Sequence, residues 1–341
     1  MDQLPALPDG ATIIYPYLPE RVSKIIAQGS SSFIGKLNEE TVLKYPSVRG
    51  EDWDRFIVEK NIYEVLCPHP RIIKSYGLDK RGLTLEYATG GTLQDHLRSL
   101  DSANSITNAD RIRWCYQAAE AVAYIHTKKV LHCDISTRNL LLDKDFNVKL
   151  SDFQGEYVDE NGVRHNGWAL ENNKAYLPRP GTHSDEQSDI FALGTSLYEI
   201  MTGHEPFPEL DEHKDGEEIE RRYQKKEFPD VQGITGGSVI SKCWNCLYKN
   251  AEACMEELHE IKLGQQNAST SGRLSKVYVF PDATTAIARL WRVCNEVMLW
   301  TVGTVAIARG VDVSLAHFGR DLEFGEWDSA EVDERTFEVD K

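Results

Sequence analysis

The chain has 341 residues, 41% of them hydrophobic, which is typical of a soluble globular protein large enough for two cores. Its formal net charge of −16 argues against nucleic acid as a partner, because the phosphate backbone would repel the average surface. The excess acid is concentrated in residues 209–220 and in the tail from residue 321 onward. We interpret both stretches as solvated surface; a docking face for a basic partner is the alternative.

No segment predicts export or membrane insertion. Residues 1–10 contain two prolines and no basic residue, unlike a secretory signal. The apolar stretch 297–308 is shorter than the roughly 20 residues that span a bilayer, and we interpret it as a packing helix. The cysteines are scattered, and Cys243 and Cys246 are better explained as reduced side chains in a helix than as a zinc site. We therefore expect a cytosolic or nuclear protein with no membrane partner.

The first part of the chain predicts strands around one helix. Residues 25–26 and 33–34 are short apolar runs on either side of a small polar turn, and residues 41–45 are β-branched and apolar. A helix is predicted over about residues 52–66, because two prolines follow it closely. Residues 83–87 predict another strand, which a pair of glycines ends.

The remainder of the chain predicts mostly helices. Thr107 and Asp110 form a capping-box start for a helix whose apolar residues recur at helical spacing as far as Ile125. A buried helix that Gly203 ends, a later helix and a polar linker are expected further on. The elements predicted after Ile125 are strands at 139–142 and 148–150, helices at 189–201 and 238–263, and a linker at 264–273.

The most informative stretch of the sequence is 132–139, together with Asp152 after the second short strand. Asp134 and Asn139 are five residues apart, and Asp152 follows thirteen residues later. Magnesium prefers hard oxygen ligands and keeps several waters, so a carboxylate and an amide suffice to hold it over a phosphate chain. Asp152 and Asn139 are the predicted ligands. Asp134 then remains free to accept or orient the proton of an attacking hydroxyl.

This arrangement resembles the catalytic loop and the metal-binding loop of the eukaryotic protein kinase family. The resemblance covers residues 22–262, and the motifs resemble those of divergent kinase-like proteins of filamentous fungi. It implies an α+β, two-lobed protein kinase-like fold, with a small β-rich N-lobe containing one helix and a larger, mainly helical C-lobe. The predicted divisions are an N-lobe at 22–86, a hinge at 87–91, a C-lobe at 92–262, a linker at 263–283 and a C-terminal extension of unknown role with an acidic tail at 284–341.

The resemblance assigns a phosphate-binding pair to the N-lobe. Lys44 stands at the end of a strand and resembles the lysine of the family's third strand, a point charge suited to the α- and β-phosphates. Glu59 is the predicted ion-pair partner, because it shares one face of its helix with Phe56 and Tyr63 and therefore points inward.

The adenine site is expected at the segment that resembles the hinge. Leu85 would be the gatekeeper, and the backbone at Glu86 and Ala88 would hydrogen-bond adenine.

The glycine-rich loop of the family is poorly matched. Aligning Ile34 with the family's valine places Ala27, Gly29 and Ser32 at the three glycine positions. Only Gly29 keeps the glycine that lets a backbone approach phosphate, so we expect a stiffer loop.

The catalytic loop also departs from the family pattern. Cys133 replaces the arginine that couples this loop to a phosphorylated activation segment, so activity is predicted not to depend on that phosphorylation. Ser136 occupies the usual lysine position of serine/threonine kinases, and Arg138 would neutralise the γ-phosphate instead. Gln154 replaces the glycine after Asp152-Phe153, and residues 176–180 stand where an Ala-Pro-Glu motif belongs.

The resemblance implies a protein kinase that uses ATP and Mg²⁺ and transfers the γ-phosphoryl group to a protein hydroxyl. Arg138 resembles the tyrosine-kinase spelling, but serine or threonine is the predicted acceptor. Asp189 is expected to hold the backbone of the catalytic loop, and His132 to pack beneath the metal loop. The alternative is a pseudokinase scaffold that binds nucleotide without transfer, and a small-molecule kinase is ranked last. The sequence does not name the protein substrate.

Overall fold

The computed structural model describes residues 17–29, 31–99, 105–181, 183–274, 306–308 and 311–313. The chain divides into two compact units, residues 1–267 and residues 268–341. Among the described helices, none is long and apolar enough to cross a membrane.

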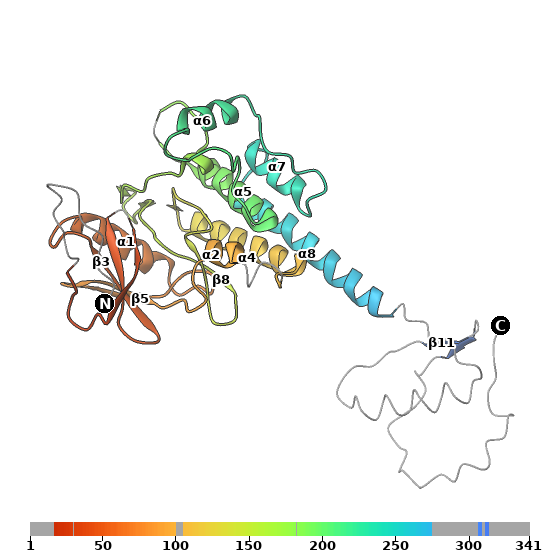
Figure 1. The fold of residues 1–341 in the computed structure, drawn as a ribbon, viewed down its shortest axis with the longest axis horizontal. Helices are drawn as coiled ribbons and strands as arrows, with labels where there is room; N and C mark the ends of the chain where they lie inside the picture. The colour runs from red at the N-terminus through yellow and green to blue at the C-terminus, as the bar shows by residue number, and fades with distance from the viewer. Residues whose placement is uncertain are drawn as a thin grey trace, which may run out of the picture. The chain divides into compact units, whose positions relative to one another are not determined.

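The N-terminal part of the first unit is an antiparallel sheet with one long helix beside it (Figure 1). The strand order in this five-stranded sheet is β1-β2-β3-β5-β4. The helix α1 packs against β4 and β5. The strands are β1 (Lys24–Gln28), β2 (Ser32–Lys36), β3 (Thr41–Pro46), β4 (Ser75–Asp79) and β5 (Gly82–Glu86), and the helix is α1 (Trp53–Leu66).

The two faces of β3 pack against different hydrophobic clusters. Leu43 and Tyr45 pack with Phe33 in a small cluster on one face, whereas Val42 joins the main core on the other. Because side chains alternate along a strand, Lys44 lies on the same face as Val42. Gly82 allows β5 to approach this strand: its φ is +150°, and a Cβ there would lie 2.2 Å from the Lys44 carbonyl oxygen.

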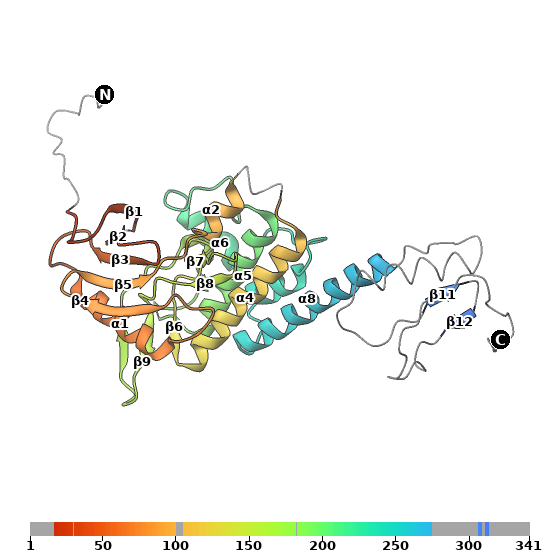
Figure 2. The same cartoon turned by 90° about the horizontal axis from the view of Figure 1, so that it is seen from below.

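The C-terminal part of the first unit is mainly helical, with short strands between its helices (Figure 2). The α4 helix packs against α5, and α5 against α7. These elements are α2 (Leu93–Arg98), α4 (Asn108–Thr127), β6 (Val130–Leu131), β7 (Leu140–Leu142), β8 (Val148–Leu150), β9 (Glu156–Val158), β10 (Arg164–Asn166), the 3-10 turn η1 (Asn173–Ala175), α5 (Glu186–Thr202), α6 (Gly216–Gln224), α7 (Gly237–Trp244) and α8 (Ala251–Leu274).

The α5 helix is the centre of this lobe. Every residue from Ser188 to Ile200 is buried, which confirms the predicted buried helix. Asp185 and Ser188 form a capping box at its start, and Gly203 ends it with a φ of +85°. The two-lobed α+β fold predicted from the sequence is therefore confirmed.

The prediction of a single helix at 238–263 is wrong. The structure has α7 and α8, separated by a turn in which Cys246 takes a left-handed φ of +53°. The Leu247 N–H bonds back to the Lys242 carbonyl at 2.9 Å, which closes α7 without the glycine that usually marks such an end. Because the apolar periodicity continues across this turn, the sequence pattern does not mark it.

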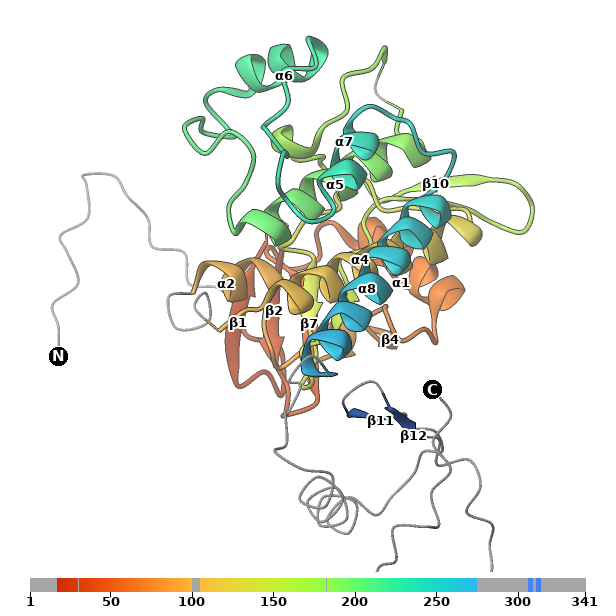
Figure 3. The ribbon, with the colours of Figure 1, turned by 90° about the vertical axis from the view of Figure 1, so that its right-hand side faces the viewer.

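The predicted linker is also wrong over its first part, because α8 continues to Leu274. Its Gln, Asn and Ser residues are only moderately worse helix formers than alanine, and no proline interrupts them. The α8 helix runs beside α4 (Figure 3). Tyr116 of α4 contacts the ring of His259 in α8, with ring centroids 5.4 Å apart.

Most of the predicted C-terminal extension, including its acidic tail, lies outside the described residues. The exceptions are β11 (Ala306–Ala308) and β12 (Val311–Val313), which pair antiparallel. The packing helix predicted at 297–308 is therefore wrong at its last three residues. These residues form a short continuous apolar run, which is consistent with a strand when a second run, Val311–Val313, follows and pairs with it.

Candidate active site

The centre of the site is the buried ammonium of Lys44. Its Nζ lies 2.6 Å from Oε2 of Glu59 on α1, so the structure contains the ion pair predicted from the sequence. The same ammonium contacts Oδ1 of Asp152, the first residue of the predicted metal loop. Lys44 is only 3% exposed and Glu59 is fully buried. A strand, a helix and a loop that lie far apart in the sequence therefore meet at one cation.

The carboxylates around Lys44 offset the effect of burial on its ammonium. Desolvation lowers the pKa of the Lys44 ammonium, but the carboxylates of Asp152 and Glu59 outweigh it, and the pKa lies above its usual value. The pKa of Asp152 is lowered, because Lys44 overcomes the effect of desolvation. Burial raises the pKa of Glu59, which Lys44 offsets only in part. The ammonium is therefore charged at neutral pH and available to an anion.

The catalytic loop brings Asp134 and Asn139 into direct contact. Asn139 Nδ2 donates to the Asp134 carbonyl oxygen at 2.8 Å and to Asp134 Oδ2 at 2.9 Å. Burial raises the pKa of the Asp134 carboxyl to about 6, although His132 and Asn139 lower it. A carboxylate with such a pKa is well matched to accept a proton near neutral pH.

Asp189 of α5 holds the backbone of this loop, as predicted. Its carboxylate accepts from the N–H of His132 at 2.8 Å and from the N–H of Cys133 at 2.9 Å. Cys133 has a φ of +63°, a conformation that a residue other than glycine adopts only when its surroundings hold it there. His126 lies 3.0 Å from the same carboxylate. These bonds hold the backbone immediately before Asp134.

The metal loop rests on the predicted core histidine. His132 is fully buried, and its Nε2 lies 2.9 Å from the carbonyl oxygen of Ser151. The ring of Phe153 packs between His132 and Tyr63, with a centroid distance of 5.1 Å to each. The packing of this phenylalanine positions Asp152 opposite Lys44.

The segment predicted to bind adenine connects the two lobes. Leu85 is 6% exposed in β5 and belongs to the main core. The Glu86 carboxylate accepts from Lys149 Nζ at 2.8 Å and from the Lys74 N–H at 3.0 Å. The side chain of Glu86 is thus engaged, and its backbone N–H donates to the Lys74 carbonyl oxygen at 2.8 Å. Ala88 follows as a buried residue.

The predicted phosphate loop lies between β1 and β2. Ala27 is the register partner of Ile34, and the Gly29 N–H bonds to the Ser32 carbonyl at 2.8 Å. A Cβ at position 29 would meet only Ser32, at 3.5 Å. The turn itself therefore does not require glycine at this position.

Arg138 makes a contact that the sequence did not indicate. Its guanidinium is 44% exposed, and Nη1 lies 3.3 Å from Oε1 of Glu212, in the acidic stretch after α5. The structure thus places the predicted γ-phosphate ligand in a surface ion pair. Nothing in the sequence motif points to Glu212, because the two residues are 74 positions apart.

The activation segment, residues 155–185, has its own ion pairs in place of the missing motif. Arg179 Nη2 lies 2.5 Å from Glu171 Oε2, and Arg164 Nη1 lies 2.5 Å from Glu156 Oε2. These pairs join residues eight positions apart. The sequence analysis missed them because they follow no family motif.

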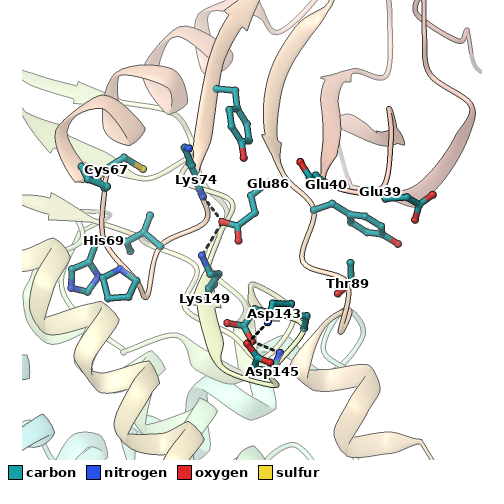
Figure 4. A pocket seen from close by; sticks show the side chains of 16 residues that line it. Glu39, Glu40, Cys67, His69, Lys74, Glu86, Thr89, Asp143, Asp145 and Lys149 are labelled. Carbon is teal, nitrogen blue, oxygen red and sulfur yellow. Dashed lines mark hydrogen bonds and ion pairs between the residues drawn. The ribbon is translucent and has the colours of Figure 1, made fainter.

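A cavity of about 650 Å³ lies beside the hinge rather than at Lys44 (Figure 4). Its lining includes Lys74, Lys149 and the side chain of Glu86, with Asp143 and Asp145 in the turn below. None of the predicted catalytic or metal-binding residues lines it. Acidic and basic groups face each other across this space, so its charge does not indicate one kind of ligand.

Comparison with known proteins gives a consistent result. Residues 36–260 match the family described as protein tyrosine and serine/threonine kinase. An Aurora kinase from Debaryomyces hansenii is 35% identical over 152 residues, which cover 42% of this chain and 36% of that protein. Aurora kinase A-A from Xenopus laevis is 36% identical over 167 residues, covering 47% and 39%.

A third relative belongs to another group of kinases. Mitogen-activated protein kinase kinase kinase 7 from Homo sapiens is 34% identical over 148 residues, which cover 42% of this chain and 24% of that protein. The chain thus matches less than two-fifths of the length of each of these relatives.

Proposed function

This chain belongs to the protein tyrosine and serine/threonine kinase family, and from that premise we propose that it transfers the γ-phosphoryl group of Mg·ATP to a protein hydroxyl, with serine or threonine as the acceptor. We assign the kinase domain to residues 22–262. The observation that carries the proposal is the meeting of Glu59, Lys44 and Asp152 in one buried ion-pair network. A scaffold that only binds partners has no use for three charges at one point, of which Lys44 and Glu59 are buried.

Lys44 is the proposed ligand of the α- and β-phosphates. Glu59 holds its ammonium from the side of α1, so the charge is fixed before nucleotide arrives. A preorganised cation stabilises the charge that moves onto the leaving phosphates without reorganising during the reaction. The Lys44 contact with Asp152 would loosen as the phosphates compete for the same ammonium.

Asp134 is the proposed acceptor of the hydroxyl proton. The hydroxyl oxygen bonds to the γ-phosphorus while the bond to the β,γ-bridging oxygen breaks, so ADP leaves and the proton passes to the Asp134 carboxylate. The bond from Asn139 holds this carboxylate in place. Arg138 supplies positive charge beside the γ-phosphoryl group.

The oxygen ligands at the site fit magnesium. Asn139 donates its Nδ2 to Asp134, which leaves its Oδ1 for a cation, and the Asp152 side chain is 43% exposed. Within the described part of the chain, no cluster of three His, Cys, Asp or Glu side chains could hold a metal alone. One carboxylate and one amide suffice when phosphate oxygens and water complete the shell. Mg²⁺, when bound there, offsets the charge of the phosphates.

The partners and the compartment are proposals from the sequence alone. We propose a protein substrate, no nucleic-acid or membrane partner, and a cytosolic or nuclear location, on the grounds of the net charge and the scattered cysteines. The pseudokinase alternative is less favoured, because Lys44, Asp134, Asn139 and Asp152 are all retained.

A paired assay tests the proposal. Thermal unfolding is measured with and without Mg·ATP, alongside phosphate transfer to the protein itself and to a generic basic protein. Ligand at a hundred times its dissociation constant should stabilise the fold by about 2.7 kcal/mol. We expect that shift together with transfer, and we expect Asp134→Asn to lower transfer by about 10²–10⁴-fold while the shift persists. A shift without transfer would favour the pseudokinase, and transfer by the variant would remove Asp134 from its role.

A further inference from the structure

The acidic stretch at 209–220 is linked to the catalytic loop through a single side chain. Glu212 Oε1 lies 3.3 Å from Nη1 of Arg138, four residues after Asp134. The Glu212 side chain is 24% exposed and that of Arg138 is 44% exposed. Arg138 has a proposed role at the γ-phosphoryl group, whereas Glu212 has no role in that mechanism.

Glu212 is anchored more firmly on its other side. Its Oε2 accepts from Asn172 Nδ2 at 2.7 Å, and its carbonyl oxygen accepts from Asn173 Nδ2 at 2.7 Å. Burial raises the pKa of the Glu212 carboxyl, but Arg138 and Asn172 outweigh it and lower the pKa. The carboxylate is therefore ionised and held in place by the activation segment. Its contact with Arg138, at 3.3 Å, is longer than those with Asn172 and Asn173 and is more open to exchange.

The exchange would take place beside the reacting groups. Arg138 and Ser136 line one small hollow together with Asn172. The Ser136 Oγ is buried there and has no hydrogen-bond partner among the described residues. The charge of Arg138 also acts on Asp134, whose carboxyl it shifts toward the ionised form. A group that replaces Arg138 on Glu212 therefore lies close to the segment that carries Asp134.

The other charges around the hollow are already matched. Lys174 Nζ lies 2.9 Å from Glu205 Oε1, and Arg98 Nη2 lies 2.9 Å from Glu199 Oε1. The exposed ring of His213 lies 3.3 Å from Glu212 Oε1. An anionic side chain arriving here would bind Arg138 itself and keep it from the γ-phosphoryl group. A cationic side chain has only to replace the half-exposed Arg138 on Glu212, and surface pairs of this kind contribute little to stability.

We propose that Glu212 is a specificity-determining residue that selects acceptors carrying arginine or lysine close to the phosphorylated hydroxyl. The cation of the acceptor takes the place of Arg138 on the carboxylate, and Arg138 turns to the γ-phosphoryl group. Binding of the correct protein thereby completes the charge arrangement for transfer. This inference rests on the proposed kinase function and names its substrate class.

The test uses degenerate peptide pools with the full-length protein. Each pool has serine or threonine at its centre and one flanking position fixed as arginine, glutamine or glutamate. Initial rates at low peptide concentration give the ratio of kcat/KM between the pools. At one or more flanking positions we expect the arginine pool to exceed the glutamine pool by about tenfold, since a hydrogen bond to a charged group contributes about that much.

Two variants locate the effect. Glu212→Gln keeps an acceptor for Asn172 but loses the charge, so the arginine preference should fall close to one, with the glutamine pool used at least as well as before. Glu212→Lys should turn the preference toward the glutamate pool. The control is Glu209→Gln, in the same stretch, because Glu209 pairs with Arg222 at 2.6 Å and does not contact the catalytic loop. This variant should keep the tenfold preference.

Three results would overturn the inference and leave the kinase function standing. They are equal use of the arginine and glutamine pools by the unaltered protein, a preference that survives Glu212→Gln, and an equal loss on all pools in that variant, which would indicate a structural role. Absence of transfer to every pool and to the protein itself, with Mg·ATP still bound, would overturn the proposed function and the inference with it.

Discussion

The Lys44 network and the activation segment keep their shape by different means. Lys44 on β3 pairs with Glu59 of α1 and with Asp152 of the metal loop, and all three residues match the motifs of the family. The activation segment lacks the family's motif and is held by ion pairs between residues close in sequence, such as Arg179 with Glu171. The buried network is specified by chemistry that admits few substitutes. The segment shows that local ion pairs can replace a family motif.

The comparison has an energetic side. Removing one partner from a buried ion pair leaves an uncompensated charge and costs about 3–5 kcal/mol, whereas an exposed pair contributes about 0–1 kcal/mol. We therefore expect mutations at Lys44 to have large effects and mutations in the activation segment to have small ones. The following predictions test that order.

Lys44→Met should have the largest effect. It leaves Glu59 and Asp152 without their cation, so the free energy of unfolding should fall by about 3–5 kcal/mol at neutral pH. Affinity for Mg·ATP should fall as well. The matched control is Lys60→Met on α1, the helix that carries Glu59, which removes an exposed pair with Glu64 at 2.6 Å and should cost less than about 1 kcal/mol. Denaturant unfolding and nucleotide titration measure both effects.

The pH dependence of this difference has a defined sign. The pKa of Asp152 is lowered from 3.8, so its stabilisation is present above that value and is lost as the pH falls through the lower folded pKa. The pKa of Lys44 is raised from 10.5, so its stabilisation is present below 10.5 and is lost as the pH rises further. The difference in the free energy of unfolding between the unaltered protein and Lys44→Met should be largest between the pKa values of Asp152 and Lys44. A difference that does not change with pH would show that packing, not charge, is responsible.

Much of this network could be predicted from the sequence. Asp134, Asn139 and Asp152 lie at fixed spacings within one stretch, and Glu59 lies on the apolar face of a predicted helix. The Glu212 contact with Arg138 could not be predicted, because no spacing or motif connects residues that only the path of the chain brings together. The predicted helix boundaries were wrong for a related reason.

Periodicity shows which residues are apolar but not where the backbone reverses. The turn between α7 and α8 is formed by Cys246 in a left-handed conformation, and no glycine or proline marks it. The cavity beside the hinge was missed likewise, since its walls come from five separate stretches of the chain, among them the turn at Asp143. Sequence patterns report local preferences, and these features arise from how distant segments pack.

Asp134→Asn should stabilise the fold by an intermediate amount. Burial raises the pKa of this carboxyl to about 6 from 3.8, so its charged form destabilises the folded state. The native stability is complete below pH 3.8 and is lost as the pH rises through 6. The variant removes that loss, so at pH 7.5 it should be more stable by at most about 3 kcal/mol.

Two measurements check the role of Asp134. The melting temperatures of the two proteins should converge as the pH is lowered to 4. In the unaltered protein, kcat/KM should fall below a pH of about 6, because the proton acceptor must be ionised. An acid limb that is absent, or a variant that is less stable at pH 7.5, would contradict the assignment of a carboxylate whose charged form is disfavoured by partial burial.

The smallest effect is expected in the activation segment. Glu171→Gln removes the charge opposite Arg179 but keeps a hydrogen-bond acceptor, so the free energy of unfolding should fall by no more than about 1 kcal/mol. Transfer should stay within about twofold, before and after phosphatase treatment, because Cys133 offers no cation to a phosphate and the segment has its own pairs. Phosphoprotein staining verifies that the treatment is complete. If dephosphorylation instead abolishes transfer, local ion pairs do not replace the phosphate contact, and the contrast between the two regions fails.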